Sequence, residues 1–551
     1  MQVDKLAANA HSKQLKGWLS YAFASEVFVI VSLTLFLPIC LEQFARDNGV
    51  LAPEKLQPCS SSNVESATES RCVVRLGWLW IDTASFSLYV YSISVALQAL
   101  TVISMGGIAD RPSYRKRLLL GFALLGASAA MLFLVLPSSS PIWFLSALLA
   151  VVANVGFGAS VVAMNAYLPT LARGAPEVAA VPAEIDDTNA EEQHRVSQES
   201  DATGDIEQPL LPGTHTETPG ARARYDAQLS IATSRISSLG IALGYGAGIA
   251  LLLVALVPVT KLGGSTLSLR LAIGISGIWW AVFSIPAALW LPGGSVGEQT
   301  TDVDWSTRRE IIASWKRLGA MLRWSEVKRL RNTFKYLAAW FLLSDGFTTI
   351  TSTAVLFGKT TLHMQPSALI LVGVLTPSAG ILGALAWPVL QRRFGWTNLR
   401  VLVALVAMAS AIPAYGCLGF LPFVRAARWG GLTTQGEMFA LAVYFGSVYG
   451  AFQSYARAFY AELLPPGEEA RWYGLFSITD KVSFLGPLVV GLIADGTGNI
   501  RYAFVFLVGM VWLAVPLLAS VNVERGRRDA RDYRWVRTGG NGFEGDGPTD
   551  R

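Results

Sequence analysis

Long apolar runs separated by short polar connections dominate the chain, and a few longer polar stretches interrupt them. A helix of about 20 apolar residues crosses a hydrocarbon layer of about 30 Å, so each long run is able to span a membrane. Because the runs are continuous and not alternating, a transmembrane barrel is excluded. The twelve predicted spans cover approximately 18–40, 85–109, 118–136, 142–168, 233–257, 269–291, 335–358, 367–390, 399–420, 438–460, 474–493 and 501–521.

The first run, Trp18 to Cys40, carries a single charged residue, Glu26. The run is too long for a signal peptide and no small-residue cleavage site follows it, so we expect it to remain as the first span. A carboxylate this deep in a membrane is costly and usually faces a wet cavity or a partner. Glu26 is therefore a candidate transport residue, with a structural contact between helices as the alternative.

The composition fits a protein whose main solvent is lipid. Hydrophobic residues make up 52% of the chain and charged residues 15%, whereas soluble domains carry about 25% charged residues. The net charge of +5 is mild, and we interpret it through the positive-inside rule, with the lipid bilayer and not nucleic acid as partner. The four cysteines and four histidines show no metal-ligand spacing. No metal site, cofactor or catalytic group is predicted, and the protein is not expected to be an enzyme.

The distribution of basic residues predicts the orientation of the spans. Lys and Arg concentrate after the second span, after the eighth span and in the tail, whereas alternate loops such as 136–142 are nearly uncharged. Since Lys and Arg favour the cytosolic side, both termini are predicted to be cytosolic. The basic residues concerned are Arg111, Arg115, Lys116, Arg117, Arg392, Arg393, Arg400, Arg525, Arg527 and Arg528.

Three polar segments lie between the spans. The loop 42–80 is expected on the lumenal side, where Cys59 and Cys72 either form a disulfide or remain two free thiols. The segment 173–228 is an acidic cytosolic insert that can bury too little apolar surface to fold and is expected to be disordered. The linker 293–333 is predicted to hold an amphipathic helix on the cytosolic leaflet, with a solvated linker helix as the alternative. The apolar face of that helix consists of Ile311, Trp315, Leu318 and Leu322.

Six spans, a linker and six further spans indicate an internal duplication of the kind found in major facilitators. We therefore predict an all-α polytopic membrane protein with the major facilitator fold, built from twelve transmembrane helices in two six-helix halves. The predicted segments are 1–172 with spans 1–4, the insert 173–228, 229–292 with spans 5–6, the linker 293–333, 334–521 with spans 7–12, and the cytosolic tail 522–551.

The two halves carry matched charges. A short repeat in the fifth and eleventh spans places Arg235 opposite Lys481, and Glu26 has a rough counterpart in Asp345. A zwitterion needs a cation for its carboxylate and an anion for its ammonium, and both pairings strengthen in a low dielectric. Arg235 or Lys481 is the candidate for the carboxylate, and Glu26 or Asp345 the candidate for the ammonium or for a coupling proton.

Each of these basic residues has a simpler explanation as well. Arg235 and Lys481 lie within about two turns of the cytosolic ends of their spans, so they could extend to the headgroups. Asp480 could merely neutralise Lys481. Arg457, close to the cytosolic end of the tenth span, is interpreted as an interfacial anchor or gate residue.

The loop between the second and third spans, GGIADRPSYRKR from Gly106 to Arg117, resembles the loop signature of the major facilitator superfamily. In that superfamily the acidic and basic residues of the loop form a charge network at the cytosolic gate. The resemblance implies this role for Asp110, Arg111 and Arg115, and Asp480 is a fourth gate candidate. The second glycine of the signature is missing here, so the loop geometry is expected to differ.

A closer resemblance rests on three stretches: Glu26 to Gly49, Ser237 to Gly248 and Tyr455 to Pro487. Together they resemble the autophagy-related protein 22 family of fungal vacuolar transporters, and the likeness extends over most of the chain. The resemblance implies a multi-pass protein of the vacuole membrane that exports neutral amino acids such as leucine, isoleucine and tyrosine to the cytosol. In that family these amino acids come from autophagic degradation, and their release supports survival in nitrogen starvation.

The expected mechanism is alternating access, in which two six-helix halves rock about a central site. A proton on Glu26 or Asp345 could bias the cycle, although facilitated diffusion is equally allowed. Two other functions remain open at this point. The protein could carry another solute, such as a sugar or a drug, or it could be a membrane scaffold that recruits autophagy factors through its acidic insert.

Overall fold

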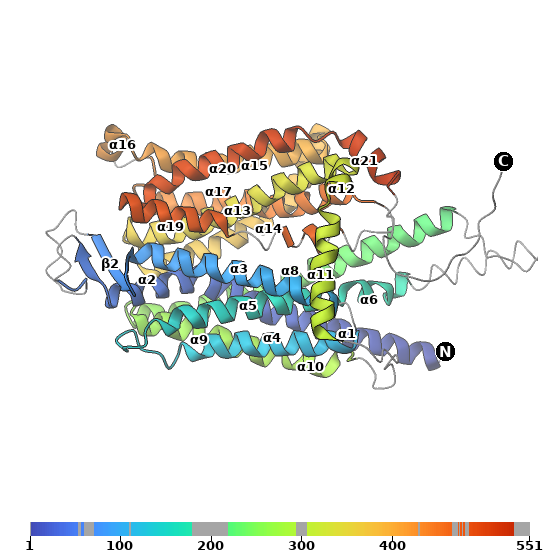
Figure 1. Ribbon diagram of the computed structural model, residues 1–551, viewed down its shortest axis with the longest axis horizontal. Helices are drawn as coiled ribbons and strands as arrows, with labels where there is room; N and C mark the ends of the chain where they lie inside the picture. Colours follow the sequence, from blue (N-terminus) through green and yellow to red (C-terminus); the bar gives the residue numbers. More distant parts are fainter. Residues whose placement is uncertain are drawn as a thin grey trace, which may run out of the picture.

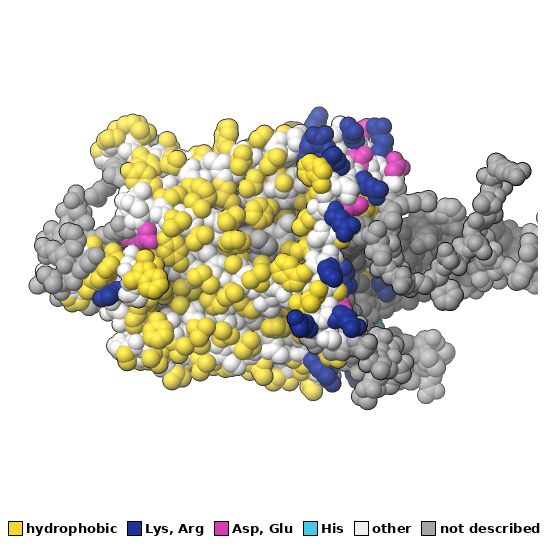
Figure 2. Space-filling model, viewed as in Figure 1, with side chains coloured by type: hydrophobic (Ala, Val, Ile, Leu, Met, Phe, Trp, Pro, Cys, Tyr) yellow, Lys and Arg dark blue, Asp and Glu magenta, His cyan; other side chains and the backbone are white. Residues whose placement is uncertain are grey.

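A computed structural model describes residues 2–52, 57–59, 71–109, 112–178, 219–293, 306–427, 430–465, 472, 474–476, 478–479 and 484–533. The fold is a bundle of long helices lying roughly parallel, with a small sheet at one end (Figure 1). We call this end the sheet end. The opposite end carries a band of exposed Lys and Arg side chains (Figure 2) and is called the basic end. Its exposed residues include Arg117, Arg323, Arg329, Arg525 and Arg528.

The first half of the bundle begins with a continuous rod made of α1 (Gln2–Val27), the π-helical η1 (Phe28–Phe36) and α2 (Leu37–Asp47). Proline lacks an N–H donor and crowds the preceding turn, and Pro38 lies where the π-helical segment returns to α-helix. The other helices of this half are α3 (Thr83–Ala109), α4 (Pro112–Leu132), α5 (Leu145–Asn165), α6 (Leu168–Arg173), α8 (Pro219–Lys261), α9 (Thr266–Phe283) and α10 (Ile285–Trp290).

The second half follows a linker that contains α11 (Thr307–Met321) and α12 (Trp324–Arg329). Its helices pack mainly on one another, as those of the first half do. They are α13 (Arg331–Thr360), α14 (Pro366–Phe394), α15 (Asn398–Leu418), α16 (Pro422–Ala427), α17 (Gln435–Ala461), α19 (Leu485–Thr497), η3 (Ile500–Tyr502), α20 (Ala503–Ala519) and α21 (Val523–Arg531).

Each half is packed around a fully buried tryptophan. In the first half, Trp280 of α9 stacks on Phe28 at 5.2 Å between ring centroids and meets Phe157 edge-on. In the second half, Trp340 of α13 stacks on Phe476 at 4.5 Å and on Phe452 at 5.7 Å. Such rings bury large apolar areas and lock the relative rotation of the helices that carry them.

Nine helical runs within the described residues are long and apolar enough to cross a membrane. The three other predicted spans overlap α4, α17 and α19, so every predicted span is mainly helical over its described residues. The nine runs are Asn9–Asp47, Thr83–Gly106, Leu145–Arg173, Leu239–Lys261, Thr266–Trp290, Arg331–Thr360, Pro366–Gln391, Asn398–Leu418 and Ile500–Ala519.

The boundaries of two polar segments differ from the prediction. Residues 219–228, which we assigned to the disordered insert, form the first turns of α8. The sequence ARARYDAQ there is rich in good helix formers, which explains the helix. Residues 179–218 of the insert lie outside the described part of the chain. Residues 42–47, assigned to the loop, belong to α2.

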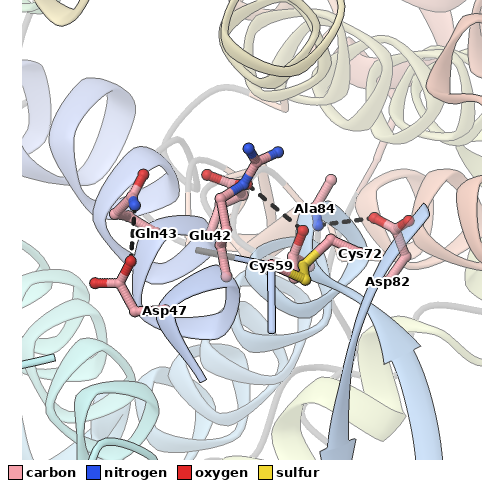
Figure 3. Close-up of a disulfide and its surroundings, with 9 residues drawn as sticks. Glu42, Gln43, Asp47, Cys59, Cys72, Asp82 and Ala84 are labelled. Carbon is pink, nitrogen blue, oxygen red and sulfur yellow. Dashed lines mark hydrogen bonds and ion pairs between the residues drawn. A yellow bond between two sulfur atoms is a disulfide. The ribbon is translucent and has the colours of Figure 1, made fainter. Parts of the chain in front are cut away.

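The sheet consists of three antiparallel strands in the order β1 (Val50–Ala52), β2 (Arg71–Leu76) and β3 (Leu79–Asp82). Cys59 and Cys72 form a disulfide with their Cα atoms 5.9 Å apart. Figure 3 shows this disulfide between Glu42 of α2 and Asp82 at the end of β3. The sheet is thus fastened beside the ends of α2 and α3.

Candidate functional site

Glu26 lies where α1 packs against α8 in the first half. A Cβ atom at Gly244 of α8 would overlap the Glu26 side chain, so the glycine is what allows this close approach. The charges of Glu26 and of Arg457, on α17 of the second half, both lie within electrostatic range of the next residue, Tyr245. A carboxylate and a guanidinium from opposite halves are therefore within electrostatic range of the same tyrosine.

Arg457 lies on a polar and aromatic face of α17. Tyr449, Gln453 and Arg457 are spaced four residues apart and so share one face of the helix. The Gln453 amide donates to the Tyr449 hydroxyl at 2.8 Å. The Tyr449 ring packs on Phe347 of α13, with centroids 5.4 Å apart, and stacks on Phe445. The face therefore combines a cation, an amide and an aromatic surface.

These residues lie nearer to the basic end than to the sheet end. Arg457 is about 33 Å along α17 from the first residue of that helix at the sheet end, at about 1.5 Å per residue. Glu26 is a comparable distance along its rod from Asp47. We call Glu26, Tyr245, Tyr449, Gln453 and Arg457 the central cluster.

Asp345 of α13 occupies a different environment from Glu26. It is 1% exposed, and its Oδ2 accepts a hydrogen bond from the backbone N–H of Gly486 at 2.8 Å. Gly486 is the second residue of α19, so the carboxylate binds at a helix N-terminus, where a negative charge is favourable. Its Oδ1 has no hydrogen-bond partner among the described residues. Asp345 is thus held inside the second half, between α13 and α19.

The predicted correspondence between Glu26 and Asp345 has a structural counterpart. Each acid lies on the first helix of its half and packs against a glycine of that half's fifth span, Gly244 or Gly486. The surroundings nevertheless differ, because Glu26 is half-buried and Asp345 is almost completely buried.

Several predicted site residues cannot be located in the same way. Arg235 lies on α8, but its side chain is outside the described part of the structure, as are Lys481, Asp480, Asp110 and Arg111 altogether. Their roles stay predictions. Arg115 is described: its Nε donates to the Ala109 carbonyl at 3.1 Å, and its guanidinium lies over the Tyr167 ring. It ties α3, α4 and the segment after α5 together at the basic end.

A buried ion pair joins the halves at the sheet end. Glu42 of α2 is completely buried, and its carboxylate lies 2.6 Å from the Lys359 ammonium of α13. Lys359 also donates to the side chain of Gln43 at 3.0 Å and to the Ile39 carbonyl at 3.2 Å. Arg46 provides a second cation to Glu42 at 3.1 Å. A lysine of one half is therefore enclosed by acceptors of the other.

A second set of contacts between the halves lies between α3 and α19. Asp495 accepts hydrogen bonds from the Tyr89 hydroxyl and from the backbone N–H of Asp82, both at 2.7 Å. Ser85 donates to the Gly491 carbonyl at 2.9 Å, and any Cβ at Gly491 would collide with the Tyr89 ring. These contacts and the Glu42–Lys359 pair together form what we call the sheet-end lock.

Sequence reasoning missed the sheet-end lock. It placed Glu42 in a polar loop, because the apolar run ends at Cys40, although the Glu42 and Arg46 spacing would have fitted another helical turn. Lys359 closes the seventh span and resembles an ordinary terminal lysine. Only the packing of the halves shows that the two residues meet.

Comparisons with known proteins identify the family. A family model described as "Vacuole effluxer Atg22 like" matches residues 10–531. Autophagy-related protein 22 of Cryptococcus neoformans is 42% identical over 559 residues, covering 94% of this chain and 96% of the relative. The chain belongs to the vacuole effluxer Atg22-like family.

Other comparisons agree with this assignment. Autophagy-related protein 22-1 of Neosartorya fischeri is 41% identical over 563 residues, covering 94% of this Atg22-like chain and 91% of the relative. Among solved structures, a POT family transporter in complex with 5-aminolevulinic acid is similar in fold. Its TM-score is 0.53 at 11% identity, over 92% of this chain and 95% of that structure.

These findings confirm the family and the major facilitator fold that the sequence predicted. The protein is a multi-pass membrane protein of a transporter family. The count of twelve spans stays a prediction, since nine runs of the described residues meet the length and hydropathy required of a span.

The sheet-end lock makes Lys359 a strong stability determinant. Replacing Lys359 by Gln leaves Glu42 buried without its closest cation, and losing one partner of a buried pair costs about 3–5 kcal/mol. We expect a clear drop in the thermal unfolding midpoint of the detergent-purified protein. The matched control is Lys261→Gln, an exposed lysine at the end of α8. Adding Glu42→Gln to Lys359→Gln should recover part of the loss, and a double variant whose loss equals the sum of both singles would contradict the pairing.

Two variants of Asp345 separate what its hydrogen bond contributes to stability from what its charge contributes. Asp345→Asn keeps an oxygen for the Gly486 N–H and removes a buried charge, so we expect the unfolding midpoint to stay the same or rise. Asp345→Ala removes the acceptor at the start of α19 and should cost about 1 kcal/mol. Equal losses in both variants, measured by thermal unfolding, would rule out the helix-terminus role.

Proposed function

We propose that this chain is a vacuolar amino acid effluxer. It exports neutral amino acids of the leucine, isoleucine and tyrosine type, released by autophagic degradation, from the vacuole lumen to the cytosol by alternating access. This export supports survival in nitrogen starvation. The proposal is supported by the family match over residues 10–531 and by the position of Glu26, which packs on Gly244 of α8 and lies, like Arg457 of the other half, in electrostatic range of Tyr245.

The orientation rests on two features of the ends. The basic end carries the exposed Lys and Arg band (Figure 2), which by the positive-inside rule favours the cytosol. The sheet end carries the Cys59–Cys72 disulfide, which fits an oxidising compartment and hence the lumen. The start of α1 and the end of α21 both lie at the basic end (Figure 1), so we assign both termini to the cytosol. Under this orientation the protein lies in the vacuole membrane with its lock on the lumenal side.

The chemistry of the central cluster suits a neutral amino acid. In our proposal the Glu26 carboxylate binds the substrate ammonium and the Arg457 guanidinium binds its carboxylate, because charge-assisted pairs are the strongest hydrogen bonds available. Tyr449, backed by Phe347, offers an aromatic surface to the substrate side chain. Arg457 is thus proposed to bind the substrate carboxylate, the role that the sequence suggested for Arg235 or Lys481. Those two residues remain candidates for substrate contact.

The cycle follows from where the two polar layers lie. The sheet-end lock closes the lumenal side, while the central cluster lies nearer the cytosolic end. In this conformation substrate leaves to the cytosol. Opening the lock and closing the basic end, where Asp110, Arg111, Arg115 and Asp480 are the gate candidates, would expose the cluster to the lumen. A proton taken up by Glu26 or Asp345 from an acidic lumen is the candidate coupling ion.

The test is efflux of labelled leucine from loaded vacuolar vesicles. Glu26→Gln and Arg457→Gln each remove one charge-assisted interaction of about 2 kcal/mol, so we expect about 30-fold weaker apparent leucine affinity in each variant. The control Arg393→Gln removes an exposed cation at the same end of the second half and should transport normally. Wild-type efflux in both test variants would refute the site.

Competing solutes test the substrate class in the same vesicles. Isoleucine and tyrosine should compete with leucine, whereas sugars should not, since they lack both charges. Asp345→Asn and Glu26→Gln test whether a proton is coupled to transport. The variant that removes the proton-binding carboxylate should make efflux independent of lumenal pH.

A further inference from the structure

The linker helix α11 lies across the side of the bundle at the basic end, nearly perpendicular to the spans (Figure 1). It is joined to α3 of the first half: the Trp315 indole N–H donates to the Ser104 hydroxyl at 3.2 Å. Ile311 and Leu318 are partly buried on the same side of α11, and Met321 is buried. Part of the apolar face that the sequence predicted therefore packs against protein and not against lipid.

The contact with α3 fixes the depth of α11. Ile93, Leu97 and Leu100 form an exposed apolar stripe along α3, with exposed fractions of 55%, 43% and 50%. In a membrane protein such a stripe faces lipid. Ser104 follows Leu100 by one helical turn, about 6 Å. Ser104 is also two residues from the end of the apolar run Thr83–Gly106, so the helix bound there lies at the edge of the apolar belt, near the level of the lipid headgroups.

A second face of α11 is basic and carries an exposed apolar residue. A shallow groove there is lined by Ser306, Arg308, Arg309, Ile312, Ala313 and Lys316. Among the described residues that line this groove, three are cations and none is an acid. The nearby acid Glu310 forms an ion pair with Arg317 on the same helix. Ile312 is 45% exposed between the cations, and Figure 2 shows basic and apolar side chains side by side in this part of the molecule.

We propose that this groove, the α11 groove, binds the phosphate-bearing headgroup of an anionic phospholipid of the adjacent leaflet. Arg308, Arg309 and Lys316 pair with the headgroup, and Ile312 lies against the start of the acyl chains. Membrane binding of a basic amphipathic helix at this depth is strengthened both by burial of its apolar side chains and by its attraction to anionic lipid. The assignment to the cytosolic leaflet rests on the orientation given under the proposed function; the binding itself does not.

Binding at this position would act on the linker between the halves. The segment from α10 to α13 is the covalent connection of the two halves, and α11 is its part that packs on the first half. A lipid held by α11 fixes that packing to the membrane surface. We therefore expect anionic lipid to alter the rate at which the halves exchange between conformations, without contacting the central cluster.

The test measures lipid binding to the purified full-length protein in detergent. The probes are short-chain phosphatidylinositol 4-phosphate, short-chain phosphatidylcholine, the free inositol phosphate headgroup and inorganic phosphate, each titrated with thermal unfolding as the readout. We expect the anionic lipid to raise the unfolding midpoint. Phosphatidylcholine and inorganic phosphate should leave the midpoint unchanged, and the free headgroup should bind at least 10-fold more weakly than the lipid.

Two variants and a matched control locate the site. Arg308→Gln with Arg309→Gln and Lys316→Gln should weaken binding of the anionic lipid at least 10-fold. Ile312→Asn should weaken the lipid but not the free headgroup. The control removes three exposed cations elsewhere at the basic end, with Arg393→Gln, Arg400→Gln and Arg525→Gln, and should bind within about twofold of the original protein.

Four results would overturn the proposal. The triple α11 variant could bind the lipid as tightly as the original protein, or the control could lose as much affinity as the triple variant. Inorganic phosphate could match the lipid, which would make the groove a plain anion site. Binding could also occur only after deletion of residues 180–217, which would make the acidic insert of this chain the occupant. None of these results depends on leucine transport, so they are separable from a failure of the proposed function.

Discussion

The buried contact between Glu42 and Lys359 constrains the whole molecule, because neither charge tolerates an apolar environment alone. Glu42 is completely buried, and the Lys359 side chain is only 16% exposed. A pair of this kind is stable only while the two halves stay together at that end. The disulfide-fastened sheet and the Asp495 contacts lie beside it and reinforce the closure. Any large relative motion of the halves in this conformation must therefore occur at the basic end.

In the proposed cycle, the central cluster lies toward the end of the molecule where the halves move. Glu26 and Arg457 come from different halves, so their separation changes whenever the halves rock. An amino acid that bridges the two charges would favour one range of separations and disfavour others, which is the differential affinity a ligand needs to shift a conformational equilibrium. Asp345 cannot act in this way directly, because it is bound to α19 of its own half. Its influence has to pass through the α13–α19 packing.

The sequence predicted the fold well because hydropathy reports directly on helices that face lipid. The order of the spans, the two halves and the likeness of Glu26 and Asp345 all follow from patterns along the chain. The partners across the halves do not. Periodicity gives the face of a helix but not which helix packs on it. Lys359 was therefore interpreted as a lysine at the end of a span and Glu42 as a loop residue. Tyr449 and Gln453 were missed because polar aromatic residues and amides are common in membrane spans. They become candidate site residues only because they share a face of α17 with Arg457.

The most direct measurement is the labelling of a single cysteine in place of Gln453, with Cys40 and Cys417 replaced, by a membrane-impermeant thiol reagent in sealed vacuoles. Our account predicts labelling from the cytosolic side and protection from the lumenal side. It also predicts that Lys359→Gln, which weakens the lumenal closure, increases lumenal labelling at the expense of cytosolic labelling. Labelling from the lumenal side alone, or a pattern unchanged by Lys359→Gln, would contradict it.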